Sequence, residues 1–143
     1  MRKQLIKNER GAALLETAIT IPIILLISVG IFEFGRAYQT WQVLTNAARE
    51  GARIAVLAES SDADVSAAVT NYMNGGRLTD VQSAAVTVER NVIVNGRSSS
   101  RITINYPFSF IVLNPVVRLV DGQSATGAAP LTMQSVALMR NEG

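Results

Sequence analysis

The residues whose spacing indicates chemistry lie at the junction between a basic leader and an apolar run. Gly11 ends the basic segment, Ala12 begins the apolar one, and Glu16 follows one helical turn later. A peptidase that cuts after Gly11 would leave Ala12 with a free ammonium group, and residues four apart lie on one face of a helix. The spacing therefore predicts a cleavage site whose new N-terminus pairs with the Glu16 carboxylate, in the same chain or in a neighbouring one.

A second interpretation of Glu16 requires no cleavage. A carboxylate near the middle of a membrane costs about 2.5–3.5 kcal/mol on insertion scales, so its position needs a reason. Glu16 lies only about one turn inside the apolar run, and from there its side chain can extend towards the lipid head groups. The residues alone leave both interpretations open.

The apolar run has the length of a membrane span. Residues 12–32 are almost wholly apolar, and about 21 residues at about 1.5 Å each give roughly 31 Å, the thickness of a bilayer core. The run is longer than that of a signal peptide and ends without an Ala-x-Ala site. Basic residues gather in the leader, residues 1–11, namely Arg2, Lys3, Lys7 and Arg10. We therefore expect a single span that is retained, with a cytoplasmic N-terminus and the remainder outside.

Composition argues against catalysis and against nucleic-acid binding. The 143-residue chain has no cysteine and no histidine, which excludes disulfides, thiolate chemistry, a Ser-His-Asp triad and histidine-ligated metal. Its net charge is +2. Because the leader has a net charge of +3, the rest of the chain is at −1, which argues against a basic patch of the kind that binds phosphates. The carboxylates of the outer part are scattered. We expect no enzymatic activity, cofactor or metal site, and no nucleic-acid partner.

Helical periodicity continues beyond the membrane span. Residues 33–58 contain no proline, and small or apolar residues recur there at spacings of three and four. Ala47, Gly51 and Ala55 form a ridge of small residues that favours close backbone approach, against the chain's own sheet or against another subunit. Pro22 cannot donate to the carbonyl of Ala18, so a kink or local loosening is predicted there.

Two motifs in this helix resemble the TadE-like family, minor pilins or pseudopilins of tight-adherence (Flp-type) pilus systems. The first is Glu33-Phe34-Gly35-Arg36 after the apolar run, and the second is Ala47-Ala48-Arg49-Glu50-Gly51-Ala52-Arg53. The leader with Gly11 and Glu16 is similar to that of type IV prepilins. Glu33 and Arg36 are spaced as an ion pair, whereas Arg49 and Arg53 are interpreted either as a solvated face or as partners of sheet carbonyls or acidic groups.

Residues 59–143 are expected to form a small extracytoplasmic α+β domain. Ser61 with Asp64 predicts a helix N-terminus, and Asn74-Gly75-Gly76 its end. Alternation from Val86 to Val94 and from Ile102 to Phe108 predicts a hairpin joined by a polar loop, residues 95–100, and a third strand spans 131–140. The fold class is a long N-terminal helix packed on a small antiparallel sheet, as in pilins. Residues 107–120 have no assigned role.

The resemblance implies a structural function. It predicts a subunit that assists assembly of a Tad/Flp-type pilus or related secretion system from the inner (cytoplasmic) membrane. The implied partners are a prepilin peptidase, other Tad pilins or pseudopilins, and inner-membrane assembly proteins. The alternative is an uncleaved bitopic envelope protein whose outer domain scaffolds a complex or binds a ligand. A TadF-like rather than TadE-like subfamily is a further possibility.

Overall fold

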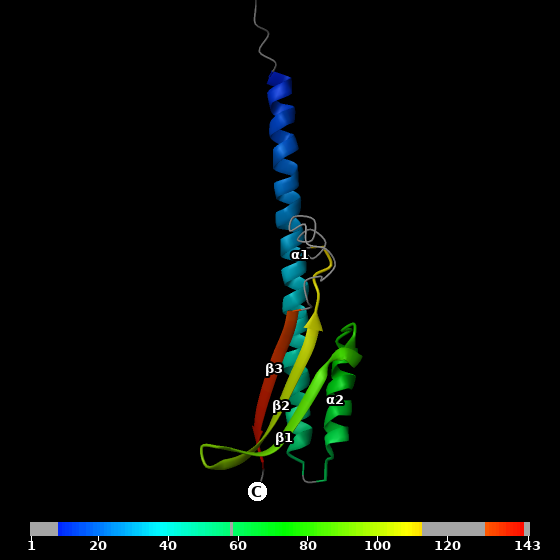
Figure 1. Cartoon of the computed structure of the whole chain (residues 1–143), viewed down its shortest axis with the longest axis vertical. Coiled ribbons are helices and arrows are strands. Elements are labelled where there is room, and N and C mark those ends of the chain that lie inside the picture. Colours follow the sequence, from blue (N-terminus) through cyan, green and yellow to red (C-terminus); the bar gives the residue numbers. More distant parts are fainter. Residues whose placement is uncertain (1–8, 58, 113–130, 142–143) are drawn as a thin grey trace, which may run out of the picture.

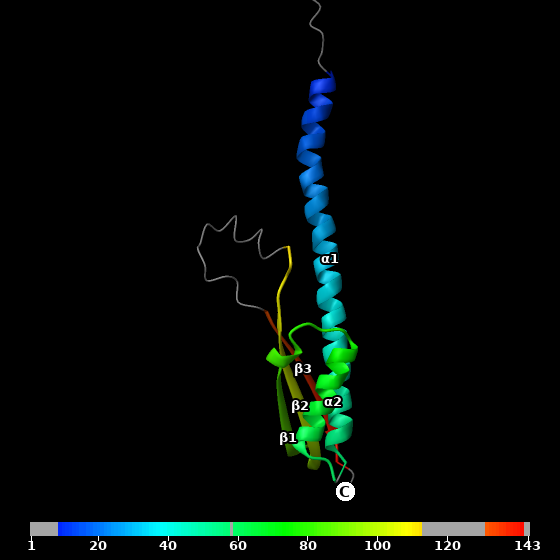
Figure 2. The same ribbon diagram turned by 90° about the vertical axis from the view of Figure 1, so that its right-hand side faces the viewer.

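One long helix organises the whole molecule. The computed structural model describes residues 9–57, 59–112 and 131–141. Helix α1 spans Glu9–Ala55, 47 residues; its N-terminal half projects as a bare rod, and its C-terminal half packs into a small domain (Figure 1, Figure 2). The helix ends at Ala55, short of Ala58, because other groups take its last carbonyls. The Ser60 hydroxyl donates to the carbonyl of Ile54 at 2.7 Å, and Arg90 donates to the carbonyl of Ala55 at 2.9 Å.

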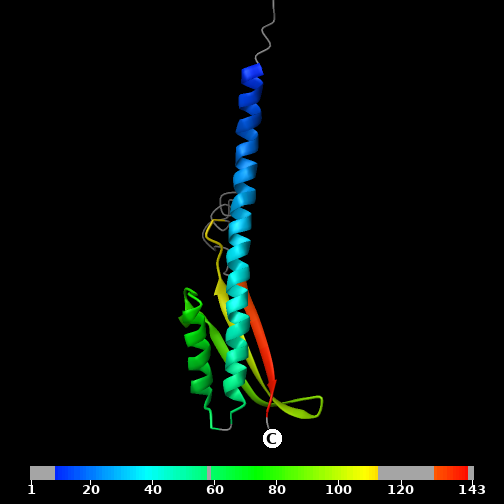
Figure 3. The same ribbon diagram turned by 180° about the vertical axis from the view of Figure 1, so that it is seen from behind.

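Pro22 lies inside α1 without interrupting it. The residues on either side remain helical, and the exposed half of the rod shows no sharp bend in any view (Figure 3). The missing proline N–H leaves one carbonyl of the helix without its usual partner. The local loosening predicted at this position is therefore compatible with a continuous helix.

Three antiparallel strands form the sheet, in the order β1-β2-β3. They are β1 (Ala85–Val94), β2 (Arg97–Phe108) and β3 (Leu131–Arg140). Figure 3 shows α1 crossing one face of the sheet with α2 beside it. Together with α1 this is the α+β architecture expected from the sequence, and the hairpin and the third strand are confirmed.

The predicted six-residue loop of the hairpin is wrong, because the turn contains only Asn95 and Gly96. Both have positive φ, 52° and 72°, which is the type I′ geometry that matches the twist of a hairpin. The serines that follow belong to β2. On β1, Arg90 and Asn91 together oppose Ser100, since the register shifts between Glu89 and Val92. This is a β-bulge, and Asn91 with φ 58° takes its left-handed position.

Helix α2 spans Asp62–Gly75 and begins with the predicted capping box. The Ser61 hydroxyl accepts from the Asp64 N–H, and the Asp64 carboxylate accepts from the Ser61 N–H at 2.9 Å. Hydrogen bonds from the Ser61 hydroxyl and N–H lower the pKa of Asp64. A short 3-10 helix, Val81–Ser83, then leads into β1.

The core lies between the sheet, α2 and the C-terminal half of α1. Its buried apolar residues are Leu44, Ala47, Ala48, Ala52, Ala55, Val65, Val69, Met73, Val81, Ile102, Ile104, Tyr106 and Phe108. The ridge of small residues faces this core. A Cβ on Gly51 would lie 2.6 Å from Val69 Cγ2 and 3.4 Å from Ile102 Cγ2. The ridge thus brings α1 close to α2 and β2 of its own chain.

Candidate assembly site

The N-terminal half of α1 is an apolar stalk that touches nothing else in the described chain. None of its most apolar 18-residue window is buried. Its hydroxyl groups are satisfied within the helix: Thr17 donates to the carbonyl of Ala13 at 2.8 Å, and Ser28 donates to that of Ile24 at 2.8 Å. A helix with an apolar surface and internally satisfied polar groups is suited to lipid. Among the residues that the structure describes, this is the one helix long and apolar enough to cross a membrane, as in a single-pass membrane protein.

The predicted cleavage junction lies within the first turns of α1. The helix begins at Glu9, so Gly11 and Ala12 are both helical. Ala12 and Glu16 are exposed, and their spacing places them on one face. Within the described residues the Glu16 side chain makes no hydrogen bond or ion pair. In the uncut chain, the ammonium group predicted to pair with it does not exist.

Glu33 and Arg36 form an internal charge clamp at the base of the stalk. The Glu33 side chain is completely buried, and its Oε2 lies 3.0 Å from Arg36 Nη2. Its Oε1 accepts from the Val112 N–H at 2.6 Å. Arg36 also donates to the carbonyl of Ser109, and its guanidinium lies 4.6 Å from the centre of the Phe108 ring. The clamp ties α1 to the segment that leaves β2.

In the middle of the same motif, Phe34 packs against the domain and Gly35 does not. Phe34 meets Phe110 edge-on with ring centres 6.1 Å apart, and Phe110 meets Phe108 in the same way at 5.3 Å. Gly35 is exposed, and a Cβ there would meet no atom within 4 Å. The described chain therefore gives no packing reason for glycine at position 35.

The second motif divides between core and surface. Ala47, Ala48, Gly51 and Ala52 are buried. Arg53 is exposed and pairs with Glu50, with Nη2 2.6 Å from Oε1, and hydrogen bonding to Arg53 lowers the pKa of Glu50. Arg49 is exposed and makes no hydrogen bond within the described part of the chain. Neither arginine bonds a carbonyl of the sheet.

Arg90 is a structural residue that the sequence reasoning missed. Its guanidinium donates to the carbonyls of Ala55 and Ser60, each at 2.9 Å, and to the Asp62 carboxylate at 2.7 Å. It therefore joins β1 to the connection between the two helices. The available signal was its place in the alternation, because Arg90 interrupts the inward-facing series of valines at Val86, Val88, Val92 and Val94.

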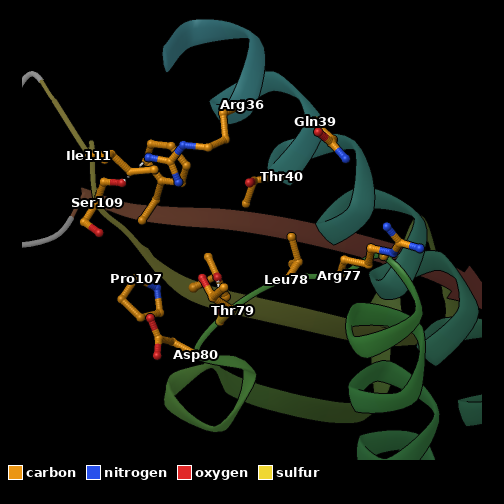
Figure 4. Close-up of a pocket in the computed structure, with 13 residues that line it drawn as sticks. Arg36, Gln39, Thr40, Arg77, Leu78, Thr79, Asp80, Pro107, Ser109 and Ile111 are labelled. Atoms are coloured by element: carbon orange, nitrogen blue, oxygen red, sulfur yellow. Dashed lines mark hydrogen bonds between the residues drawn. The ribbon is translucent and has the colours of Figure 1, made fainter. Parts of the chain in front are cut away.

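A cavity of about 380 Å³ lies between α1, the connection after α2 and the end of β2. Arg36 and Ile111 stand at one end, and Asp80 and Pro107 lie across from the helix (Figure 4). The Tyr106 hydroxyl, at its wall, donates to the carbonyl of Thr79. Asp80 is the lone carboxylate among the lining residues, and the described residues contain no cluster of three or more His, Cys, Asp or Glu side chains. The cavity thus offers no metal ligand set and no pair of carboxylates.

Comparison with known proteins finds a family match for the long helix. Residues 11–53 match the family model described as TadE-like protein. No curated protein and no solved structure matches the chain. The matched stretch contains the apolar stalk, the charge clamp and the ridge of small residues. The long helix of this chain is therefore similar to the TadE-like family, as its two motifs indicated, and this similarity suggests a protein associated with the Tad pilus.

Proposed function

We propose that the protein is a minor pilin or pseudopilin-like subunit that assists assembly of a Tad/Flp-type pilus. The observation that carries the proposal is the apolar stalk, exposed along its length and continuous with the helix that forms the core of a folded domain. Such a surface needs an apolar environment. The bilayer supplies it before assembly, and the stalks of other subunits supply it in a filament.

In this proposal the inner membrane holds the unassembled protein with the N-terminus in the cytoplasm. A prepilin peptidase cuts between Gly11 and Ala12 and removes the basic leader. The glycine supports this role physically, because a helix is opened more easily at glycine than at other residues except proline. Partners are the other Tad pilins and inner-membrane assembly proteins. We assign no catalytic activity, since the chain has neither histidine nor cysteine and its cavity has no carboxylate pair.

Glu16 acts after the cut. Its exposed carboxylate forms an ion pair with the Ala12 ammonium group of a neighbouring subunit in the apolar interior of the filament. This ion pair sets the axial register between the two subunits. Buried charges that specify register are an attested device in helical assemblies. Before assembly, the same carboxylate remains at the membrane edge, where its side chain reaches the head groups.

Intact mass and N-terminal sequencing of the protein from its native host test the proposal. The expected product begins at Ala12 when the prepilin peptidase is active and at Met1 when the peptidase is inactivated. An intact Met1 form in the presence of active peptidase would contradict the proposal and favour an uncut bitopic protein that scaffolds an envelope complex or binds a ligand.

Three variants separate the role of Glu16 from that of the cut. Glu16→Ala and Glu16→Gln should be cleaved normally and be depleted from purified pilus fractions. Thr17→Ala is the matched control, because it removes a polar group from the same turn without removing a charge. Normal recovery of both Glu16 variants with pili would show that the carboxylate does no more than reach the head groups.

A further inference from the structure

Three aromatic side chains form a stripe on α1 beyond the predicted span. Phe34, Tyr38 and Trp41 follow one another at helical spacings of four and three. All three are exposed, and even Trp41 leaves 47% of its surface uncovered. The Tyr38 and Trp41 rings are 6.1 Å apart, and the Tyr38 hydroxyl accepts from Gln42 at 2.7 Å. Tyrosine and tryptophan gather where a protein crosses from hydrocarbon into head groups.

The end of the folded domain that faces the stalk exposes apolar side chains beside this stripe. Ile111 is 60% exposed and Leu131 is 55% exposed. Both belong to the end at which β2 leaves the sheet and β3 enters it, since Phe108 pairs with Leu131. Figure 1 shows this end directed along α1 towards the bare stalk, with the hairpin at the opposite end.

The opposite end of the domain combines polar groups with exposed apolar side chains, Ile93 and Leu57. Asn141 hydrogen-bonds Ser98, Ser100 and Asn91 there, and the Asn95–Gly96 turn projects beyond them. The stalk-facing end is distinguished by its contact with the aromatic stripe, since Phe110 meets Phe34 edge-on with ring centres 6.1 Å apart.

We propose that the outer domain rests directly on the lipid bilayer and that residues 17–37 of α1 occupy the hydrocarbon core instead of residues 12–32. With a core ending at Phe32, Trp41 would stand about 14 Å beyond it. Each head-group layer is only about 5–7 Å thick, so the stripe would lie in water. With a core ending at Ala37, Trp41 lies about 6 Å beyond the edge, within the head groups.

The shifted position also accounts for the charged groups of α1. Glu16 then lies just outside the hydrocarbon on the cytoplasmic side, and the Gly11–Ala12 bond lies about 8 Å outside it. Glu33 lies about 6 Å inside the edge, but its side chain is fully buried and accepts from Val112 and Arg36, so it exposes no charge to lipid. The Val112 backbone enters the membrane to the same depth as Glu33, where its N–H is satisfied by the carboxylate. Arg36 is near the edge, and its guanidinium is held by the Glu33 carboxylate and the Ser109 carbonyl.

Tryptophan fluorescence tests this placement, because Trp41 is the one tryptophan of the chain. The full-length protein is reconstituted at a low protein-to-lipid ratio in phosphatidylcholine–phosphatidylglycerol vesicles that carry bromine either high or low on the acyl chains. We expect bromines near the head groups to quench Trp41 more strongly than bromines near the bilayer centre. The position of the domain on the bilayer does not depend on removal of the leader, so the uncut chain is a suitable sample.

Two reporters in a Trp41→Phe background give the depth scale. Phe34→Trp, about two turns closer to the stalk, should respond to deeper bromines than Trp41. Ile93→Trp, at the end of the domain farthest from the stalk, should not be quenched. Circular dichroism establishes that each variant is folded.

Two outcomes would overturn the proposal. Trp41 emission as insensitive to brominated lipid as that of the Ile93→Trp reporter would show that the domain stands away from the bilayer. Alternatively, Trp41 fluorescence could become sensitive to brominated lipid only when the protein is diluted further in lipid. This result would show that a second copy of the chain, and not lipid, covers the stripe.

Discussion

The close contact at Gly51 makes a quantitative prediction about the joint between the stalk helix and its domain. In Gly51→Ala, the new Cβ would lie 2.6 Å from Val69 Cγ2 and 3.6 Å from Val65 Cγ1. Both valines are fully buried and are stiff about χ1, so the contact is relieved only by separating α1 from α2. Overpacking of this kind costs about 1–3 kcal/mol, while replacing glycine by alanine inside a helix returns up to about 1 kcal/mol.

The net loss expected for Gly51→Ala is therefore about 0–2 kcal/mol in the free energy of unfolding relative to the wild type, and Gly51→Val should lose more. For a domain of this size each kcal/mol lowers Tm by about 4–8 °C. Guanidinium unfolding of the full-length protein in detergent, followed by near-ultraviolet circular dichroism, measures the difference. Gly75→Ala is the matched control, because a Cβ there meets no atom within 4 Å, and its stability should be unchanged or slightly higher. Gly51→Ala as stable as this control would refute the close packing of α1 on α2.

Three further perturbations address the clamp, the inter-helix joint and the helix cap. Glu33→Gln should lose about 1.5–3 kcal/mol, because the Arg36 guanidinium loses its charged acceptor, and limited proteolysis near Ser109 should accelerate; unchanged proteolysis would argue against the clamp. Arg90→Lys should unfold at a lower denaturant concentration than the wild type, since an ammonium group cannot reproduce the forked contacts with Ala55, Ser60 and Asp62, whereas Arg101→Lys, at an exposed cross-strand pair, should change little. The capping box gives a pH dependence, because the folded-state pKa of Asp64 is lowered. The contribution of Asp64 to the stability of the fold is present above the ordinary aspartate pKa and is lost as pH falls through the folded-state pKa. Thermal melts of the wild type and Asp64→Asn should therefore differ at neutral pH and converge in acid.

Local patterns predicted most of the fold because each element has its own signal. The Ser61–Asp64 capping box, the alternation of β1 and the terminal strand were all readable from neighbouring residues. The predicted hairpin loop is too long, because a polar run is not by itself a turn. The serines after Gly96 are polar, yet Ser99 and Ser100 are buried in β2. The Asn95–Gly96 dipeptide, and not the polar run, contained the information.

Contacts between distant segments could not be read in the same way. The spacing of Glu33 and Arg36 predicted their ion pair, but nothing local indicated that Val112 and Ser109 complete it. The same holds for Arg90, whose acceptors lie some thirty residues earlier in the chain. Periodicity reports which face of an element is buried, whereas partners across the fold depend on how the elements are stacked.

The packing of α1 implies that the stalk and the domain move as one body. Five of the thirteen buried apolar core residues come from α1, so the domain cannot release the helix without losing a large part of its core. The clamp adds a second attachment at Glu33, about three turns before Leu44, the first buried leucine of the core. Two attachments separated along one helix resist rotation of the domain about the stalk. Any partner that binds the stalk, whether lipid or another subunit, therefore fixes the orientation of the outer domain as well. If the domain rests on the bilayer as proposed, extraction of the stalk into a filament uncovers the aromatic stripe and Ile111 in the same step, and these surfaces become available to neighbouring subunits only after the protein has left the membrane.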